Sequence, residues 1–396
     1  MAMPRGETII LTLNSGSSSL KFGLYRAEAS QTERLLTGEA DSIGEEAGQF
    51  YARDAHGDAL AVGMTSIRDQ RDAVRQIEWL LADSGMPPPA AIGHRIVHGG
   101  PKLRRHCIID DEVLQQLKAA IPFAPLHLPP ALTLIQAARE HFPRIPQVAC
   151  FDTTFHADIP DVTRILPLPK DLRAEGIQRY GFHGLSCESL LHQLGIDVPE
   201  RVVIAHLGNG ASVTAVKGGK SIDTSMGLTP TGGVIMGTRS GDLDPGVLVY
   251  LAREKKMDAA MLENLVNRHS GLLGVSAASS DMRHLHQSAP TNPDAQLAIE
   301  MFCYSVRKQI AAMIAVLEGI DLIVFAGGIG ENDEKVRAAI CSGFAWAGIG
   351  LDEARNRAAD NPISDPRLPC KVLVLPSQED EQIARHSWGL FAKGTS

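Results

Sequence analysis

The sequence lacks the features of several large protein classes. Its six cysteines form no C-x-x-C motif and no paired metal-ligand spacing, so neither a zinc ribbon nor a disulfide scaffold is expected. The thiols are predicted to be reduced and mostly buried. The net charge of −8 provides no general attraction to nucleic acid or to anionic membranes. Any anion-binding site in the chain must therefore be local.

Long apolar runs are also absent. The N-terminus has no apolar core of about 7–15 residues, as a signal peptide would have, and the longest helical apolar run, Ile310 to Leu317, is too short to cross a bilayer. We therefore expect a soluble cytoplasmic protein with neither a nucleic-acid partner nor a membrane partner. The 396 residues allow two or three domains, and 44% hydrophobic and 21% charged residues are ordinary values for a globular protein.

A polar loop, Asn14-Ser15-Gly16-Ser17-Ser18-Ser19-Leu20-Lys21, lies between two apolar runs. Thr8 to Leu13 predicts a buried strand, and Phe22 to Tyr25 predicts a strand that returns beside it. A turn of glycine and serine exposes N–H groups and hydroxyls that can bind phosphate oxygens, and Lys21 adds a positive charge. The pattern G-x-x-x-x-G-K-[ST] is absent. The loop is therefore either a plain hairpin turn or a phosphate site built on a hairpin.

The order strand, polar turn, strand, turn, strand occurs twice. The first copy covers Thr8 to Asp41, and the second covers Val202 to Thr224, with Gly208 to Ser212 as its polar turn. Self-similarity at the scale of a domain indicates duplication. We expect two similar α/β domains that face one another, with a nucleotide in the cleft between them.

Other segments have simpler patterns. Asp281 to Arg283 is expected to open a loop, and the polar segment from residue 42 to 63 has no clear pattern. Helical spacing or composition predicts helices over residues 66–84, 111–119, 131–141, 294–317 and 382–391, with further helices between 247 and 269 and a last strand over 371–375.

Two more strand ends carry candidate site residues. Gln147 to Phe151 predicts a buried strand that ends on Asp152. Ligands of open α/β sheets bind beyond the carboxyl ends of strands, although an aspartate there can also simply cap the next turn. Asp321 to Phe325 predicts another strand, and the glycine-rich segment Ala326 to Asn332 leads from it toward a helix that begins near Asp333. Glycines at such a turn let a ligand approach a helix N-terminus.

Two arginines and two histidines stand out from the rest. Arg95 and Arg239 each lie among glycines, where a guanidinium group can reach a phosphate or a carboxylate. The alternative for either arginine is a surface salt bridge. Most of the fourteen histidines should be structural or exposed, but His127 lies within a proline-rich frame and His183 follows Tyr180-Gly181-Phe182.

Taken together, these motifs resemble those of acetate kinases, members of the acetate and sugar kinase, heat-shock-cognate and actin superfamily. The resemblance runs from about residue 8 to 384. It includes the segments Asn14 to Lys21, His94 to Gly100, Phe151 to Thr153, Tyr180 to Gly184, His206 to Gly210, Met236 to Asp242 and Gly327 to Asn332. It implies a duplicated ribonuclease H-like, or actin-like ATPase, fold in which each domain has a mixed sheet flanked by helices. The implied domains are residues 1–152 with a C-terminal helix over 380–396, and residues 153–379.

The resemblance also implies an activity. This activity is the reversible ATP-dependent phosphorylation of acetate to acetyl phosphate by direct in-line transfer with Mg²⁺ or Mn²⁺, in a homodimer. Asn14 and Glu379 would be on the metal side, and Ser17, Ser19 and Lys21 on the phosphate side. The implied catalytic residues are Asp152, Arg95, Arg239, His183 and His127. The implied nucleotide-binding residues also include His206, Leu207, Gly208, Asn209, Gly210, Asp281, Met282, Arg283, Gly328, Ile329, Gly330, Glu331 and Asn332.

The acceptor pocket implied by the resemblance has an apolar lining. Its residues are Arg95, Val97, Leu126, Phe182 and Pro230. Because Val97 leaves less room than alanine would, we expect acetate to be preferred over propionate and butyrate. A carboxylate acceptor is already ionised at neutral pH, so Asp152 is expected to organise arginine, metal or water rather than to act as an essential base. The alternatives are a propionate or butyrate kinase and, from another class, an actin-like or chaperone-like ATPase.

The chain also departs from the family pattern at several positions. Leu128 and Ala131 stand where asparagine is common, and Leu185 and Cys187 stand where threonine and histidine are usual. Thr231-Gly232-Gly233 replaces a bulkier acidic stretch, and Gln378-Glu379-Asp380 replaces Asn-Glu-Glu. The charged catalytic positions are all kept, so the departures concern the acceptor preference and the geometry of His127.

Overall fold

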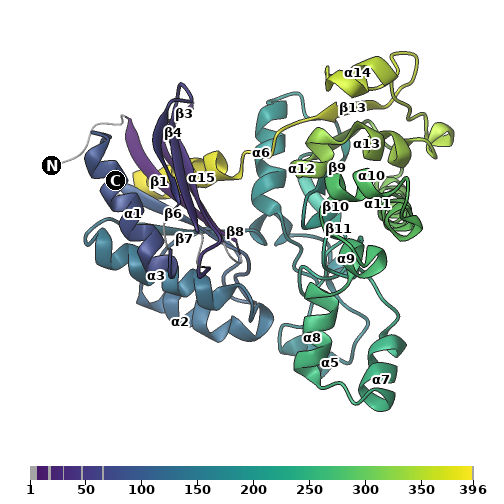
Figure 1. Ribbon diagram of the computed structural model, residues 1–396, viewed down its shortest axis with the longest axis horizontal. Coiled ribbons are helices and arrows are strands. Elements are labelled where there is room, and N and C mark those ends of the chain that lie inside the picture. The colour runs from purple at the N-terminus through teal and green to yellow at the C-terminus, as the bar shows by residue number, and fades with distance from the viewer. Residues whose placement is uncertain (1–6, 17–18, 30, 46–47, 65–66, 395–396) are drawn as a thin grey trace. The chain divides into compact units, whose positions relative to one another are not determined.

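The structure is a computed structural model that describes residues 7–16, 19–29, 31–45, 48–64 and 67–394 (Figure 1). The chain separates into two compact units. The first unit comprises Met1–Ala157, Gly184–Ser189 and Gln378–Ser396, and the second comprises Asp158–His183 and Leu190–Ser377. Each unit is built around a mixed β-sheet.

The sheet of the first unit has the strand order β5-β4-β3-β2-β1-β6-β8-β7. Strands β1 to β5 form an antiparallel meander, whereas β6 is parallel to β1 and β8 is parallel to β6. The carboxyl ends of β1, β6 and β8 therefore lie at one edge. The strands are β1 (Thr8–Ser15), β2 (Leu20–Ala27), β3 (Thr32–Asp41), β4 (Gln49–Asp54), β5 (Ala59–Met64), β6 (Ala91–Ile96), β7 (Cys107–Ile108) and β8 (Gln147–Phe151).

Helices cover both faces of this sheet. Because neighbouring residues of a strand point to opposite faces, Leu11 and Leu13 pack against α1 and α3, whereas Ile10 packs on the side of α15. Figure 1 shows α15, in yellow, beside the strands of this unit. The helices are α1 (Gln70–Asp83), α2 (Asp111–Ala119), α3 (Leu128–His141) and α15 (Glu379–Gly394), with short 3₁₀ turns η1 (Ile121–Phe123) and η2 (Thr154–His156).

The sheet of the second unit repeats the central part of the first. Its order is β11-β10-β9-β12-β13, in which β10 is antiparallel to β9 and β11, β12 is parallel to β9, and β13 is parallel to β12. This order and these directions match those of β3-β2-β1-β6-β8, so the predicted duplication is confirmed. The strands are β9 (Arg201–Leu207), β10 (Ala211–Lys217), β11 (Lys220–Thr224), β12 (Leu322–Ala326) and β13 (Lys371–Val374).

The helix predicted over residues 294–317 is confirmed as α11 (Pro293–Leu317). It begins at Asn292, whose side chain accepts hydrogen bonds from the N–H groups of Asp294 and Ala295, and it packs against β9 and β10. Helix α6 begins in the first unit and ends in the second. The remaining elements are α4 (Asp161–Arg164), α5 (Lys170–Ala174), α6 (Gly184–Leu194), α7 (Pro245–Glu254), α8 (Ala259–Arg268), α9 (Gly271–Ser276), α10 (Met282–Ser288), α12 (Gly327–Asn332), α13 (Glu334–Cys341), η3 (Ala345–Ala347) and α14 (Glu353–Ala358).

Some local predictions were wrong. Residues 42–63 contain β4 and most of β5. Asp281 does not open a loop, because its side chain accepts a hydrogen bond from the N–H of Arg283 and caps α10. The glycine-rich segment after β12 is itself the short helix α12 rather than a turn. Gly327 adopts φ +77° at that junction, where a Cβ would lie 2.8 Å from the carbonyl oxygen of Leu207, so glycine is required there.

Each of the six cysteines is a free thiol. Among the described residues, no helix is long and apolar enough to cross a membrane.

Candidate active site

Five polar side chains of the first unit meet at the edge where β1, β6 and β8 end. Asn14 lies near the end of β1, Arg95 near the end of β6, Asp152 directly after β8, and Glu379 and Asp380 in the first turn of α15. We call them the Arg95 cluster. The parallel strands bring the first three together, as expected for the carboxyl edge of an open sheet.

Arg95 is the centre of this cluster. Its Nε and Nη2 donate hydrogen bonds to Asp152 Oδ2 at 3.0 and 2.7 Å, and its Nη1 donates to Asn14 Oδ1 at 3.2 Å. Glu379 Oε2 lies 3.8 Å from Arg95 Nε. Asp152 is fully buried, and its second oxygen, Oδ1, has no hydrogen-bond partner in the part of the chain that the structure describes. That oxygen is therefore available to another positively charged group.

The side-chain amide of Asn14 is held from its other end by α15. Its Nδ2 donates to Asp380 Oδ1 at 2.8 Å and lies 3.4 Å from Glu379 Oε2. This contact fixes the orientation of the amide, so that its oxygen faces Arg95. Sequence reasoning missed Asp380, although its place beside Glu379 in an acidic first helical turn was a usable signal.

Burial and charge oppose one another in the Arg95 cluster. Burial raises the pKa of Asp152, and the guanidinium of Arg95 opposes this shift. Burial also raises the pKa of Asp380, while the hydrogen bond from Asn14 and the charge of Lys21 oppose it. The cluster thus gathers carboxylates that a further cation would stabilise in their ionised form.

The loop after Asn14 is a hairpin turn between β1 and β2. Asn14 pairs with Lys21 in the antiparallel register, and the N–H of Gly16 donates to the carbonyl oxygen of Ser19 at 2.8 Å. Lys21 is exposed. Ser17 lies outside the described residues. The hairpin is confirmed, whereas a role in phosphate binding stays a prediction.

The predicted acceptor residues belong to both units. Val97 and Leu126 lie in the first unit and are half-buried, whereas Phe182 and Pro230 lie in the second and are buried. His127 is the residue before the first turn of α3 and is partly buried.

In the second unit, His183 and Arg239 both lie beside Gly210, at the turn between β9 and β10. A Cβ on Gly210 would lie 3.3 Å from His183 Nε2 and 3.4 Å from Arg239 Nη1, so the missing side chain leaves space between these two groups. His183 Nδ1 is 2.9 Å from Ser212 Oγ, and its ring centroid is 4.3 Å from that of His206. Sequence reasoning did not single out Ser212.

The backbone explains why His183 takes up this position. It has φ +58° and is the residue that precedes the first turn of α6. This left-handed conformation is uncommon for a residue with a side chain, and such strain persists only where the surrounding structure fixes it. Arg239 Nη1 donates to the carbonyl oxygen of Pro230 at 3.4 Å.

A pocket of about 960 Å³ in the second unit gathers half of the predicted nucleotide-binding residues. Asp281 and Arg283 form an ion pair at its rim, and the side-chain hydrogen bond from Arg283 lowers the pKa of Asp281 to about 2. The predicted residues in its lining are Gly208, Asn209, Asp281, Met282, Arg283, Gly328, Ile329 and Asn332. The lining also contains Ser280, His286, Asp333, Glu334 and Lys335, which no sequence motif indicated.

Other predicted nucleotide-binding residues have different surroundings. Glu331 Oε1 accepts hydrogen bonds from the N–H groups of Gly327 and Ser377, both at 3.0 Å. The carbonyl oxygen of Gly330 accepts a hydrogen bond from Arg337. These two residues hold the loop and helix around the pocket, and they are not part of its lining. His206, Leu207 and Gly210 lie in β9 and the adjoining turn, also outside the lining.

Comparison with known proteins assigns the chain to a family. The sequence model of the acetokinase family matches residues 9–385. The acetate kinase of Methylocella silvestris is 43% identical over 96% of this chain and 98% of that protein, and an acetate kinase of Clostridium botulinum is 40% identical over 97% and 100%.

Solved structures agree with this assignment. A propionate kinase from Francisella tularensis has a TM-score of 0.90 and 36% identity, and the acetate kinase of Porphyromonas gingivalis has a TM-score of 0.86 and 36% identity; each match covers 97% of this chain and 100% of the other. The predicted actin-like ATPase fold is thereby confirmed. The chain belongs to the acetokinase family.

Proposed function

We propose that the chain transfers the γ-phosphoryl group of ATP to acetate, reversibly, giving acetyl phosphate and ADP. The observation that carries the proposal is the family match over residues 9–385, which includes the Arg95 cluster and the residues His183 and Arg239 beside Gly210. A full-length match of this kind favours a kinase over an actin-like or chaperone-like ATPase.

The pairing of Asp152 with Arg95 suits an acceptor that needs no deprotonation. Acetate is ionised at neutral pH, so the site does not require a general base. Asp152 instead holds the guanidinium of Arg95 through two hydrogen bonds to one oxygen. We infer that Asp152 orients Arg95 for contact with the acceptor or the transferred phosphoryl group.

The main barrier to this reaction is electrostatic, because an acetate anion must approach a polyanionic phosphate chain. Arg95, Arg239 and His183 offer N–H groups that neutralise negative charge and stabilise the equatorial oxygens of an in-line transition state. Gly210 leaves the space beside His183 and Arg239 into which such oxygens fit. We infer that this group acts on the transferred phosphoryl group.

The Arg95 cluster also fits a magnesium ion. Mg²⁺ prefers oxygen ligands and a small number of carboxylates, and the unpartnered Oδ1 of buried Asp152 and the carboxylates of Glu379 and Asp380 supply them. The amide oxygen of Asn14 is a further candidate ligand. When bound, the ion would neutralise charge on the phosphate oxygens. Mn²⁺ would suit the same oxygen ligands.

The adenosine of the nucleotide is assigned to the pocket of about 960 Å³ in the second unit. The backbone of Gly328 is open to ligand there, because a Cβ at this position would meet nothing within 4 Å. The end of β9 and the β9–β10 turn, from His206 to Gly210, are assigned to the phosphates, as is the β1–β2 hairpin with Ser19 and Lys21. Exposed N–H groups of such turns bind anions.

Acetate is the proposed acceptor, with propionate as a slower one. The similarity to the Francisella tularensis propionate kinase makes propionate the second candidate. Val97 favours the smaller acid, because a β-branched side chain reduces the room beside the acceptor methyl group. The free thiols support a reducing, cytoplasmic environment. A homodimer is proposed from the family resemblance alone.

An acyl-phosphate assay tests the function directly. The purified chain is incubated with ATP, Mg²⁺ and acetate, propionate or butyrate, and hydroxylamine traps any acyl phosphate as the hydroxamate. We expect acetyl hydroxamate to form fastest and propionyl hydroxamate more slowly. ATP hydrolysis without hydroxamate from any acid would contradict the proposal, and a preference for propionate would overturn the acceptor assignment.

A further inference from the structure

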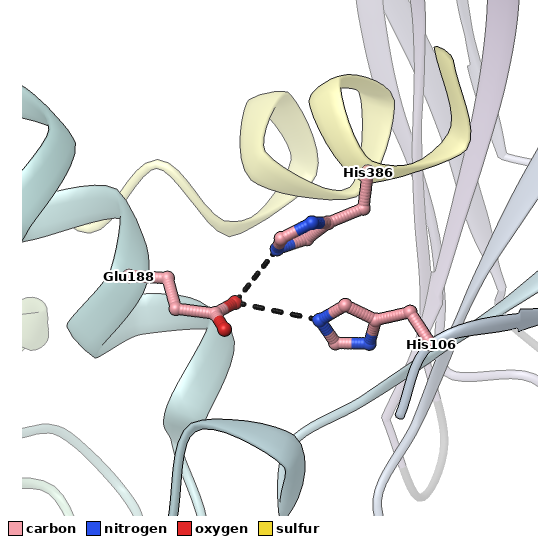
Figure 2. Close-up of side chains that lie close together, drawn as sticks. All are labelled: His106, Glu188 and His386. Carbon is pink, nitrogen blue, oxygen red and sulfur yellow. Dashed lines mark hydrogen bonds and ion pairs between the residues drawn. The ribbon is translucent and has the colours of Figure 1, made fainter. Parts of the chain in front are cut away.

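Three ionisable side chains form a second polar cluster in the first unit, apart from the Arg95 cluster. His106 precedes β7, Glu188 lies in α6, and His386 lies in α15 (Figure 2). Glu188 Oε2 lies 2.7 Å from His386 Nε2 and 3.6 Å from His106 Nε2. The two imidazole rings are 4.0 Å apart between centroids. We call this arrangement the Glu188 clasp.

The clasp is largely shielded from water. The side chains of His106, Glu188 and His386 are 9%, 18% and 25% exposed. Burial alone would raise the pKa of Glu188, but the two histidines that face it outweigh burial and lower it to about 2. Glu188 is therefore ionised at neutral pH, and burial lowers the pKa of His106.

Two imidazoles and a carboxylate are also a donor set that zinc-like ions use, so a metal site must be considered. The hydrogen bond at the other ring nitrogen of His106, Nδ1, argues against a metal site. The backbone N–H of Phe151 donates to His106 Nδ1 at 3.0 Å. A neutral imidazole that accepts at Nδ1 carries its proton on Nε2, the atom that faces Glu188. A metal would need the lone pair of that nitrogen, and a metal-bound histidine normally donates through its other nitrogen.

The clasp holds the helix that carries two members of the Arg95 cluster. Glu379 and Asp380 lie in the first turn of α15, and His386 lies about two turns further along the same helix. Apolar contacts hold one face of α15 against the sheet through Ile383 and Ala384. The contact of His386 with Glu188 adds a directional constraint that apolar contacts do not supply.

We propose that Glu188 is a positioning residue: by holding His386, it sets the position of α15 and thereby the carboxylates of Glu379 and Asp380 against Asn14. This inference rests on the proposed function, because it assigns those carboxylates to the metal side of the phosphoryl-transfer site. Glu188 itself does not contact the reacting groups in this assignment. Its effect passes through α15.

The test compares Glu188→Gln, His386→Asn and the double variant with the wild type. The measured quantities are kcat and the Mg²⁺ concentration that gives half-maximal acetyl phosphate formation. Direct outer contacts of metal ligands are typically worth about 10–100-fold in metal binding, and the clasp reaches the ligands only through α15. We therefore expect a loss at the lower end of that range, so each single variant should require about tenfold more Mg²⁺, with kcat reduced much less. Glu188→Gln removes the charge from the Glu188–His386 contact and His386→Asn removes its imidazole, so the double variant should be no worse than the single variants.

Glu78→Gln is the matched control. Glu78 Oε2 lies 2.7 Å from His141 Nδ1, so this variant removes the negative charge from a contact of the same kind and length in the same unit, away from α15. It should leave the Mg²⁺ requirement unchanged. Glu188 also contributes charge at Asp152, and this direct effect would appear in Glu188→Gln but not in His386→Asn.

Hydrogen exchange provides a readout that does not depend on activity. Both single variants should speed amide exchange in residues 379–386 about tenfold over the wild type, and Glu78→Gln should not. A wild type that forms no acyl phosphate would contradict the proposed function, while the exchange measurement would still test whether the clasp holds α15.

Several results would overturn the positioning role. One is a normal Mg²⁺ requirement and normal exchange in both single variants. Another is an effect confined to Glu188→Gln, which would indicate charge rather than position. A third is stoichiometric Zn²⁺ binding to the wild type that His106→Gln abolishes, because the Nε2 proton of His106 would then be absent. Imidazole ¹⁵N shifts of His106 should instead show the proton on Nε2.

Discussion

Arg239 is the single residue whose replacement should affect catalysis most directly. Its Nη1 lies at the space beside Gly210 and His183, and it donates to the carbonyl oxygen of Pro230. Arg239→Ala should therefore lower kcat for acetyl phosphate formation by about 10²–10³-fold, as expected for the loss of a donor to the transition state. Arg95→Ala is a less clean test, because it also leaves the buried carboxylate of Asp152 without its partner.

The control for Arg239→Ala is Arg201→Ala. Arg201 pairs with Asp321 on the surface of the same unit, so its loss should change kcat little. A well-folded Arg239→Ala protein with near-normal kcat would show that Arg239 is not catalytic.

Val97 is expected to control the size of the acceptor. Replacing valine by alanine opens room beside the acceptor methyl group, and one methylene in an apolar pocket is worth about 1–3 kcal/mol of discrimination. In Val97→Ala, the ratio of kcat/KM for propionate to that for acetate should rise about tenfold. An unchanged ratio, measured with the hydroxamate assay, would place Val97 away from the acceptor.

His94 should make the stability of the protein depend on pH. Burial lowers the pKa of His94 to about 4, and its Nε2 is 2.8 Å from Gln147 Oε1. Because the unfolded chain binds this proton near its usual pKa of about 6.5, the contribution of His94 is complete above that pH and is lost as the pH falls toward 4. Between pH 7 and pH 5 this loss amounts to about 2 kcal/mol in the free energy of unfolding.

Urea unfolding at both pH values measures the effect. The wild type should lose about 2 kcal/mol more than His94→Gln between pH 7 and pH 5, since the variant has no imidazole to protonate. Equal losses in the two proteins would show that His94 titrates normally in the folded state. Effects of other histidines, including His106, cancel in this comparison.

At the level of elements, β6 and α15 pack closely against one another at Gly93. A Cβ on Gly93 would overlap Ser387 Oγ and lie 2.5 Å from Ile383 Cγ2. Gly93→Ala should therefore push α15 away from the sheet and lower the free energy of unfolding by about 1–3 kcal/mol, as overpacking does. Gly63→Ala in β5 is the control, because a Cβ there would meet nothing within 4 Å. Equal stability of the two variants would show that α15 adjusts without cost.

The elements that could be predicted from the sequence were those with strong local patterns. The β1–β2 hairpin, its copy at β9–β10 and the long helix α11 all follow from apolar periodicity and turn residues. The meander strands β4 and β5 were missed, since half of the apolar residues in 42–63 are alanines, which have a low preference for strands. Helix α10 was missed because Asp281 was assigned to a loop instead of to a helix N-cap.

Two departures from the family pattern are explained by packing. Leu128 and Ala131 replace asparagine in α3, and both are buried in an apolar cluster with Ile96, Ile135 and Phe151. At such positions a leucine and an alanine add apolar contact and leave no amide to be satisfied. Both substitutions therefore stabilise α3 from its buried side. We expect any change in the geometry of His127 to follow indirectly, through the packing of α3.

At the level of the whole molecule, the site combines residues that only the fold brings together. Asn14, Arg95 and Asp152 could be predicted because each lies at the end of a strand within a motif. The sequence offered a signal for Asp380 in its place beside Glu379, but not its contact with Asn14, which joins positions 366 residues apart. The clasp residues were missed for the same reason, since no local pattern connects α6, α15 and the segment before β7.

The assignment of adenosine to the second unit leads to a prediction for the whole chain. Adenosine alone should slow amide hydrogen exchange in residues 208–209, 281–283, 328–329 and 332, which line the pocket, and should leave the first unit unchanged. ATP with Mg²⁺ should in addition slow exchange in β1, β2 and the first turn of α15, because the Arg95 cluster is assigned to the phosphate and metal end of the nucleotide.

Gly328→Val separates the two parts of this prediction. The pocket is open at Gly328, so a valine there should block adenosine without disturbing the packing of the fold. Adenosine should then protect none of the pocket segments, while the exchange of the variant without ligand should match that of the wild type. Protection of the first unit by adenosine alone, or unchanged adenosine protection in Gly328→Val, would show that the nucleoside binds elsewhere. The assignment of the phosphates to the two hairpins would then no longer be supported, since it depends on adenosine lying in this pocket.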